Sequence, residues 1–528
     1  MKTKFKDVIL LKDSLKEFSF NSDELRKHIG EKGAKLAELI NIGFPVPQAI
    51  VLTTSVYKNF ENDSYVLNEN LIEEIQNRLY CMERILGKNL GDENNPLLLS
   101  IRSSASVSMP AMMDTILNIG INDSIFEGLK SLYGKRFACE CYIKLLLSFS
   151  KTVFDVGFPQ VEKIRYESNT IPEIKDFIKE KCGHDFPQDI KKQLLLGTEA
   201  VFKSWKSQRA KQYRELNKIP EDIGTAVIIQ NMVYGNLNIN SLTGVAFSRN
   251  PSDGKKELYG EYLFCAQGED ITGGIKIPEN LVKLKTSFPE IFEQLHAIVE
   301  KLEKHYRDVH EIEFTVEDGI LWILQTRQAK RNIKAAVKIA VDMVNEGLIT
   351  KGEAISRIDL LQFKGLFNAD FDSDDVKNAE KKKRLIGVGL NASPGVAIGK
   401  IVFSSDELKK TEEKLILVKP FTDKDDINSI KLAEGILTTC GGMTSHAAII
   451  CRSLGKPCVV GLSSMTIDST KGTISNESIT LKRGDIISID GKSGKVFLGE
   501  IKTTKSELTD EVKILFSWMK KELLNCAS

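Results

Sequence analysis

The stretch GGMTSHAAIICRSLGKPCVVG, residues 441–461, decides the fold of the second half of this chain. Its two leading glycines permit a tight backbone path. Thr444 and Ser445 are residue types that cap a helix, which would begin at His446 or Ala447. A glycine and a proline further on end that helix. The pattern therefore predicts a tight loop and a short helix, with a histidine at the helix N-terminus.

A histidine in this place is suited to hold a phosphoryl group. The exposed N–H groups and the dipole of a helix N-terminus favour anions. They keep the imidazole neutral and nucleophilic, and they would stabilise a phosphoryl group bound to it. A capping or packed histidine is the ordinary alternative for a lone histidine. The two glycines and two hydroxyls that precede His446 favour the phosphohistidine.

The composition is typical of a soluble multidomain protein. A length of 528 residues suggests about three to four domains. The formal net charge of +1 gives no sign of a nucleic-acid partner. We find no apolar run long enough for a transmembrane helix and no apolar core of a secretory signal near the N-terminus. The nine cysteines form no C-x-x-C pair, which favours reduced thiols in the cytoplasm.

Hydrophobic periodicity and breaker residues divide the chain into segments. Helices are expected at 32–42, 68–90, 124–150 and 186–216, a β-rich run at 224–264, a helical pair at 333–358 and an amphipathic helix at 503–525. The polar segment 366–384 is expected to be a solvated linker. A second compact region is expected from Leu385 onward, with short strands interrupted by the helix that follows His446.

A β-hairpin is expected at 311–327. Glu311 and Glu313 are two residues apart and share one strand face, as do Gln325 and Arg327. A three-residue loop, Glu317–Gly319, would place both pairs on one side, whereas a two-residue loop would place them on opposite sides. We expect the three-residue loop. It would gather two carboxylates, an amide and a guanidinium on one surface suited to Mg²⁺ and a triphosphate.

Six long motifs together resemble the phosphoenolpyruvate-utilising enzymes, and within them the pyruvate, phosphate dikinase family. They are GGMTSHAAIICRSLGKPCVVG (441–461), LLLSIRSSASVSMPAMMDTILNIGIND (97–123), GTAVIIQNMVYGN (224–236), TGVAFSRNPSDGKKELYGEYLFCAQGED (243–270), EIEFTVEDGILWILQTRQAKR (311–331) and GLNASPGVAIGKIVF (389–403). The resemblance spans nearly the whole chain, about residues 20–502.

This resemblance implies an α/β and α+β multidomain fold. An ATP-grasp nucleotide-binding domain (1–332) would be followed by a helical linker (333–384), a swivelling phosphohistidine β/α domain (385–502) and a C-terminal linker helix (503–528). The implied enzyme is a phosphotransferase that uses ATP, inorganic phosphate and Mg²⁺ to phosphorylate His446. Thr444 matches a regulatory phosphorylation site of plant relatives.

The resemblance also assigns the nucleotide and metal contacts. Strand Ile228–Val233 matches the adenine-side edge. The residues assigned to ATP are Lys32, Arg102, Gln230, Met232, Glu313, Gln325 and Arg327, and those assigned to Mg²⁺ are Glu311 and Glu313. Glu311 stands where the family usually has Asp.

Four positions depart from the family pattern. Glu31 puts a carboxylate beside the expected phosphate loop, and Ser104, Ala111 and Leu242 replace glycines. Glycine lets backbone approach a phosphate closely, and a Cβ obstructs that approach. These departures could weaken or alter the use of ATP or phosphate, or they could be tolerated.

The family's C-terminal (β/α)₈ barrel, which binds pyruvate or phosphoenolpyruvate, does not fit within the residues that follow 502. We therefore expect a partial dikinase whose acceptor site lies on a separate barrel chain. The rival interpretations are a phosphotransferase with another acceptor, similar to rifampin phosphotransferase, and a non-catalytic nucleotide-binding relic. The three glycine losses favour the relic, and the retained His446, Arg102 and Glu313 oppose it.

Overall fold

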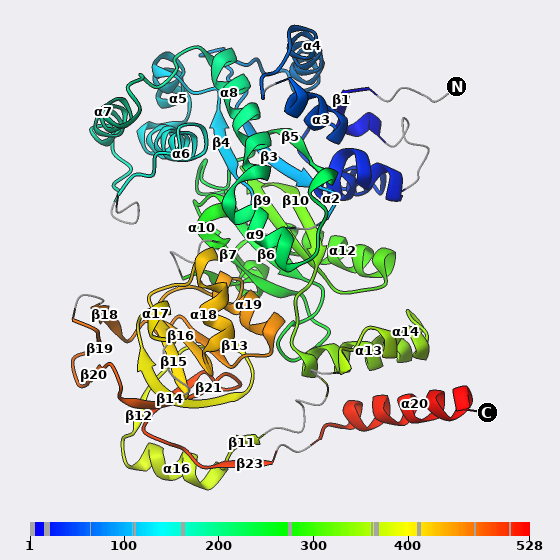
Figure 1. Cartoon of the computed structure of the whole chain (residues 1–528), viewed down its shortest axis with the longest axis vertical. Helices are drawn as coiled ribbons and strands as arrows, with labels where there is room; N and C mark the ends of the chain where they lie inside the picture. Colours follow the sequence, from blue (N-terminus) through cyan, green and yellow to red (C-terminus); the bar gives the residue numbers. More distant parts are fainter. Residues whose placement is uncertain are drawn as a thin grey trace. The chain divides into compact units, whose positions relative to one another are not determined.

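The structure is a computed structural model that describes residues 6–14, 22–63, 65–107, 109, 112–159, 164–272, 277–360, 363, 369–408, 413–468, 471–505 and 508–527. The chain forms two compact units (Figure 1). Unit 1 consists of Met1–Ser241, Val316–Asp318 and Trp322–Gln325, and unit 2 consists of Leu242–Thr315, Gly319–Leu321 and Thr326–Ser528. The multidomain mixture of helices and sheets agrees with the predicted fold class.

Unit 1 is built on an antiparallel sheet in the order β1-β2-β5-β3-β4. Its strands are β1 (Val8–Leu10), β2 (Ala49–Leu52), β3 (Leu99–Ala105), β4 (Thr115–Ile119) and β5 (Thr225–Asn231). Every residue of β5 is buried, as expected for the central strand of a covered sheet.

Helices of unit 1 pack on this sheet or on one another. They are α2 (Ser22–Asn41), α3 (Thr54–Asn62), α4 (Glu69–Leu86), α5 (Asp123–Tyr133), α6 (Lys135–Val153), α7 (Thr170–Cys182), α8 (Ile190–Lys203) and α9 (Gln208–Leu216). The expected helix at 124–150 is two helices, because Gly134 adopts a positive φ of 89° between α5 and α6.

Unit 2 contains most of a second sheet, in the order β10-β9-β6-β7-β8, with the end of β9 and the middle of β10 counted in unit 1. Its strands are β6 (Leu242–Phe247), β7 (Tyr259–Phe264), β8 (Glu279–Asn280), β9 (His310–Glu317) and β10 (Ile320–Gln328). Three helices accompany it: α10 (Gly268–Thr272), α11 (Leu284–Ser287) and α12 (Pro289–Tyr306).

An eight-stranded sheet of unit 2 supports the histidine helix. The strand order is β12-β22-β21-β14-β15-β16-β17-β13. The strands are β12 (Leu385–Val388), β13 (Leu390–Ser393), β14 (Val396–Val402), β15 (Leu415–Lys419), β16 (Gly435–Thr438), β17 (Cys458–Val460), β21 (Ile486–Asp490) and β22 (Lys495–Leu498). Helix α19 (His446–Leu454) packs on β13, β16 and β17, beside α18 (Ile427–Leu432) (Figure 1).

Smaller elements complete unit 2. They are α17 (Ser405–Leu408) and the three-stranded sheet of β18 (Thr466–Asp468), β19 (Thr473–Ser475) and β20 (Thr480–Lys482).

The two segments predicted as linkers pack against each other. Helix α13 (Ile333–Asn345) contacts α20 (Asp510–Ala527), and α14 (Lys351–Ser356) also contacts α20. Strand β11 (Ala369–Phe371) pairs with β23 (Thr503–Lys505), and α16 (Ser373–Lys381) follows β11. The expected solvated linker at 366–384 is therefore partly ordered into a strand and a helix among its described residues. The predicted domain boundaries stay a prediction, and the compact units divide at Ser241, inside the expected nucleotide-binding domain.

A buried ion cluster ties the segment just after β6 to α12 and to the C-terminal end of α13 in unit 2. The side chain of Arg249 is 0% exposed, and its guanidinium contacts Glu303 at 2.7 Å and Glu346 at 2.8 Å. Glu303 lies on α12, and Glu346 directly follows α13. Removing one partner of such a cluster leaves an uncompensated buried charge.

We expect Arg249→Ala to destabilise unit 2 by about 3–5 kcal/mol, because the carboxylate of Glu303 would stay buried without its cation. The measurement is the denaturant midpoint of the unfolding transition. Lys255→Ala is the matched control, because the Lys255–Asp253 ion pair is exposed, and it should leave the midpoint unchanged. Equal midpoints for the two variants would contradict a structural role for the cluster.

Candidate functional site

His446 is the first residue of α19, as the sequence predicts. Ser445 is the N-cap, and its side chain accepts a hydrogen bond from Ala448 N. Gly455 ends the helix in the left-handed conformation, with φ 65°. The imidazole is partly exposed, while the loop residues just before it are buried. The site thus presents a histidine ring where helix amides can stabilise an anion.

A threonine outside the motif orients this ring. The Nδ1 atom of His446 lies 3.3 Å from Oγ1 of Thr422, which is 4% exposed. If Nδ1–H donates to that hydroxyl, the lone pair of the imidazole is on Nε2, which becomes the nucleophilic atom. Sequence reasoning missed Thr422, because it lies in the loop after β15 and belongs to no motif that we recognised.

A buried glutamate holds the loop in front of His446. Glu261 lies on β7, and its carboxylate accepts hydrogen bonds from Met443 N at 2.8 Å and from Thr444 N and Thr444 Oγ1, both at 3.1 Å. Burial raises the pKa of Glu261, and the three hydrogen bonds oppose that shift. Of the two predicted capping residues, Ser445 is therefore the cap, whereas the hydroxyl of Thr444 serves Glu261.

Arg452 holds the same loop from the other side. Its Nη2 donates to Met443 O at 2.6 Å, and its Nη1 donates to Ala392 O at 2.9 Å. The guanidinium is 0% exposed, and burial lowers the pKa of Arg452. The N–H and the C=O of Met443 are thus both bonded to buried charged side chains.

Gly442 is required by this close approach. A Cβ at that position would lie 2.5 Å from Oε2 of Glu261 and 2.6 Å from Cγ of Pro278. Any side chain would push the loop off the carboxylate. The second glycine of the motif therefore serves contact with Glu261, a role that the sequence alone does not reveal.

The predicted nucleotide residues of unit 1 surround strand β3. Lys32 follows a break in α2 at Gly30, and α2 packs on β3 and β5. Arg102 lies on β3, and its Nη2 is 3.3 Å from Oε1 of Gln325. The structure therefore brings Arg102 and Gln325 together, as the assignment of both to one nucleotide site requires.

The two residues predicted for the adenine-side edge differ in exposure. Gln230 lies on β5, is 2% exposed and donates from Nε2 to Pro47 O at 3.1 Å. Met232 directly follows β5 and is partly exposed. The side-chain amide of Gln230 is thus already hydrogen-bonded within the protein, and Met232 is the more accessible of the two residues.

The predicted acidic pair of unit 2 is held by one arginine. The guanidinium of Arg327 contacts Glu311 at 2.6 Å and Glu313 at 2.5 Å. Burial opposes the positive charge, but the two carboxylates raise the pKa of Arg327. The side chain of Glu311 is 3% exposed and that of Glu313 is 20% exposed, so Glu313 is the more accessible of the two predicted ligands.

The predicted three-residue hairpin loop is wrong. Strand β9 ends at Glu317 and β10 begins at Ile320, which leaves a two-residue loop with φ 47° at Asp318 and 80° at Gly319. The predicted grouping of Arg327 with both acids is nevertheless correct. The alternation of burial along β10 changes phase at Leu324–Gln325, where two partly exposed residues follow each other.

The structure shows what surrounds two of the residues that depart from the family pattern, Glu31 and Leu242. Glu31 forms an ion pair with Lys35 at 2.9 Å, so its charge beside Lys32 is compensated. Leu242 is 0% exposed at the start of β6, where it packs as a core residue. Ala111 lies outside the described residues.

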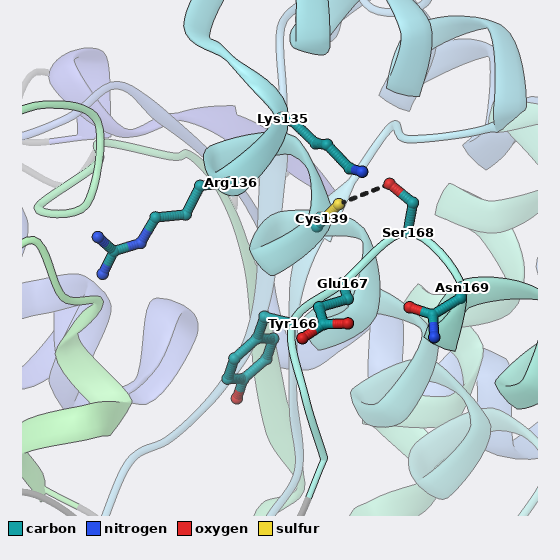
Figure 2. Close-up of a pocket in the computed structure, with 7 residues that line it drawn as sticks. All are labelled: Lys135, Arg136, Cys139, Tyr166, Glu167, Ser168 and Asn169. Carbon is teal, nitrogen blue, oxygen red and sulfur yellow. Dashed lines mark hydrogen bonds between the residues drawn. The ribbon is translucent and has the colours of Figure 1, made fainter.

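A hollow in unit 1 lies apart from all of these residues (Figure 2). It has a volume of about 650 Å³. Its lining consists of Lys135, Arg136, Cys139, Tyr166, Glu167, Ser168 and Asn169. None of the residues predicted to bind nucleotide, metal or phosphoryl group lines it.

Comparison with known proteins decides the family. A family model described as "Pyruvate phosphate dikinase, AMP/ATP-binding domain" matches residues 62–294 and 286–348. A second, described as "PEP-utilising enzyme, mobile domain", matches residues 411–494, which include His446. The chain belongs to the pyruvate phosphate dikinase family. The predicted order of an ATP-grasp nucleotide domain and a mobile histidine domain is thereby confirmed.

Curated pyruvate, phosphate dikinases are similar over almost all of the chain. The proteins of Rhizobium meliloti (strain 1021) and Clostridium symbiosum are 44% and 39% identical over 94% and 96% of this chain. Pyruvate, phosphate dikinase 1, chloroplastic, of Arabidopsis thaliana is 39% identical over 94%. The chain spans 58%, 60% and 53% of the length of these relatives.

We expect Glu261→Ala to loosen the histidine loop of this dikinase relative. Hydrogen bonds to a charged group stabilise by about 1.5–3 kcal/mol, so amide hydrogen exchange at Met443 and Thr444 should become roughly 10–100-fold faster. Exchange mass spectrometry or NMR gives the measurement. Glu257→Ala, an exposed glutamate near β7, is the control and should change neither amide. Unchanged exchange in Glu261→Ala would show that the loop does not depend on the carboxylate.

Proposed function

We propose that this chain forms a phosphohistidine from ATP and inorganic phosphate: ATP + phosphate + His446 → phospho-His446 + AMP + pyrophosphate. The observation that supports this most strongly is the oriented imidazole of His446 at a helix N-terminus in a dikinase relative. For these products, Nε2 would bond to the β-phosphorus of ATP while the bond from that phosphorus to the AMP oxygen breaks, and the γ-phosphoryl group would pass to inorganic phosphate to give pyrophosphate. The chain would thus be a kinase-type phosphotransferase.

The proposed ATP site consists of Lys32, Arg102, Gln230, Met232, Glu313, Gln325 and Arg327. A lysine provides a point charge for a phosphate, and an arginine provides a planar fork. Contacts within each unit support this grouping. In unit 1, Arg102 lies 3.3 Å from Gln325. In unit 2, Arg327 forms ion pairs with Glu311 and Glu313. Catalysis would then come mainly from positioning and from neutralising charge on the transferred group.

Glu311 and Glu313 are the proposed Mg²⁺ ligands. Two carboxylates fit this ion, because Mg²⁺ is commonly held by one or two carboxylates together with substrate phosphates. Both carboxylates bond Arg327, and the greater exposure of Glu313 makes it the better placed of the two. Bound Mg²⁺ would neutralise charge on the phosphates.

Thr444 is the proposed regulatory site. Its hydroxyl is bonded to Glu261 and it is 2% exposed, so a modifying enzyme could reach it only after the loop leaves that carboxylate. A phosphate on Thr444 would add about −1.5 to −2 charges beside a buried glutamate. Repulsion between the two negative groups would therefore prevent the phosphorylated loop from binding Glu261 again.

The final acceptor is proposed to be pyruvate, bound by a separate barrel subunit. The carrier histidine would alternate between the nucleotide site and that acceptor. The swivelling linkers would be 333–384, between the domains 1–332 and 385–502, and 503–528, which follows the second domain. We propose the cytoplasm as the compartment, because buried free thiols such as those of Cys451 and Cys458 are typical of a reducing environment. No helix in the described part of the chain is long and apolar enough to cross a membrane.

Phosphorylation of His446 is tested with Mg-ATP labelled on the transferable phosphates, with and without inorganic phosphate. We expect an acid-labile label on the intact chain that is absent in His446→Ala. His184→Ala, an exposed histidine, is the matched control and should keep the label. Label that needs no phosphate favours another phosphotransferase, and no label under any condition contradicts the proposal. Transfer of the label to pyruvate only after a barrel protein is added would identify the acceptor.

We expect Thr422→Val to slow the labelling of His446 about fivefold, because one hydrogen bond is worth roughly 1 kcal/mol and about 1.4 kcal/mol of barrier is a factor of ten. Valine has no hydroxyl to accept a hydrogen bond from Nδ1–H of His446. It therefore cannot hold the ring in the tautomer that leaves the lone pair on Nε2. Single-turnover labelling at saturating ATP gives the rate. Thr422→Ser keeps the hydroxyl and should keep the rate. A slow serine variant together with a fast valine variant would exclude this role for the hydroxyl.

A further inference from the structure

Helix α2 is broken immediately before the predicted phosphate-contacting lysine. Gly30 adopts φ 73° and ψ 171°, which is not helical, and the helix resumes at Glu31. The first amides of the resumed segment have no carbonyl of their own helix to bond. In most helices the side chain of the N-cap residue accepts from the third of these amides. Gly30 occupies the N-cap position here and has no side chain.

Strand β3 supplies the missing cap. Gly33 N, the third amide of the resumed segment, donates to Ser104 Oγ at 3.1 Å. The same hydroxyl donates to Ile29 O at 2.8 Å, the carbonyl just before the break. One side chain therefore bonds both sides of the break, and Ser104 is 1% exposed, so water does not compete for these bonds.

The close approach of the two segments also explains Gly30. A Cβ at Gly30 would lie 1.9 Å from Ser104 O and 2.3 Å from Ser104 Oγ. The turn and the strand are thus in direct backbone contact, and the hydroxyl fixes one against the other. Lys32 lies in the first turn after the break. Arg102, two residues from Ser104 on β3, projects from the same strand face.

We propose that Ser104 is a positioning residue that sets Lys32 relative to Arg102 by capping the resumed helix from β3. This inference rests on the proposed ATP site. The serine is one of the replacements of a family glycine, and its hydroxyl points at the helix break and bonds there. A side chain that holds the lysine turn in place lowers the cost of ordering that turn when ATP binds.

The test compares Ser104→Ala with Ser103→Ala. Ser103 is also buried, on the same strand, but its side chain points to the opposite face. We expect Ser104→Ala to weaken Mg-ATP binding about 5-fold by calorimetry, the effect of losing roughly one helix cap, and to speed hydrogen exchange of the Gly33 amide. Ser103→Ala should affect none of these quantities, and Ser104→Thr, which keeps the hydroxyl, should restore binding.

Three results would overturn the proposal. Faster exchange at Gly33 with unchanged ATP affinity would make the cap purely structural. Tighter ATP binding in Ser104→Ala would show that the hydroxyl withholds the Gly33 amide from a phosphate. If the unaltered chain binds no Mg-ATP, the proposed ATP site fails together with this inference, whereas the first two results leave that site intact.

Discussion

The bonding of two successive peptide units sets the geometry of the histidine site. The amides of Met443 and Thr444 donate to the buried carboxylate of Glu261, and the carbonyl of Met443 accepts from the buried guanidinium of Arg452. Opposite charges thus bond the loop from two sides, and neither charge is exposed to water. The helix that presents His446 begins two residues later, so its direction follows from this bonding.

This contact is compatible with the proposed carrier role of His446, in which the loop would also have to leave Glu261. A buried carboxylate is costly, and its hydrogen bonds with the loop compensate for that cost only while the loop is present. When the loop leaves, Glu261 and the freed amides regain water, so the net free energy of the contact is much smaller than the sum of its bonds. Three hydrogen bonds can therefore define one geometry without making it permanent, as the proposed alternation of His446 between sites requires.

The sequence predicted local features well and distant partners poorly. The helix at His446, its serine cap and its terminal glycine follow from residues within one short stretch, and all were predicted. Glu261 is 182 positions from Met443, and nothing in its own strand marks it as a partner of that loop. Thr422 likewise contacts His446 only through the fold. In the hairpin, the loop length was wrong and the grouping was right, because a phase change inside β10 has no signature in a run of apolar residues.

The replaced glycines show why motif departures need structural context. Read from the sequence, Ser104 adds a Cβ near a phosphate loop and Glu31 adds a negative charge, and both weigh against ATP binding. In the structure, the serine hydroxyl satisfies an amide and a carbonyl that the break in α2 exposes. The glutamate is neutralised by a lysine one turn further along the same helix. Both contacts stabilise the fold whether or not ATP binds, so neither departure counts against the proposed nucleotide site.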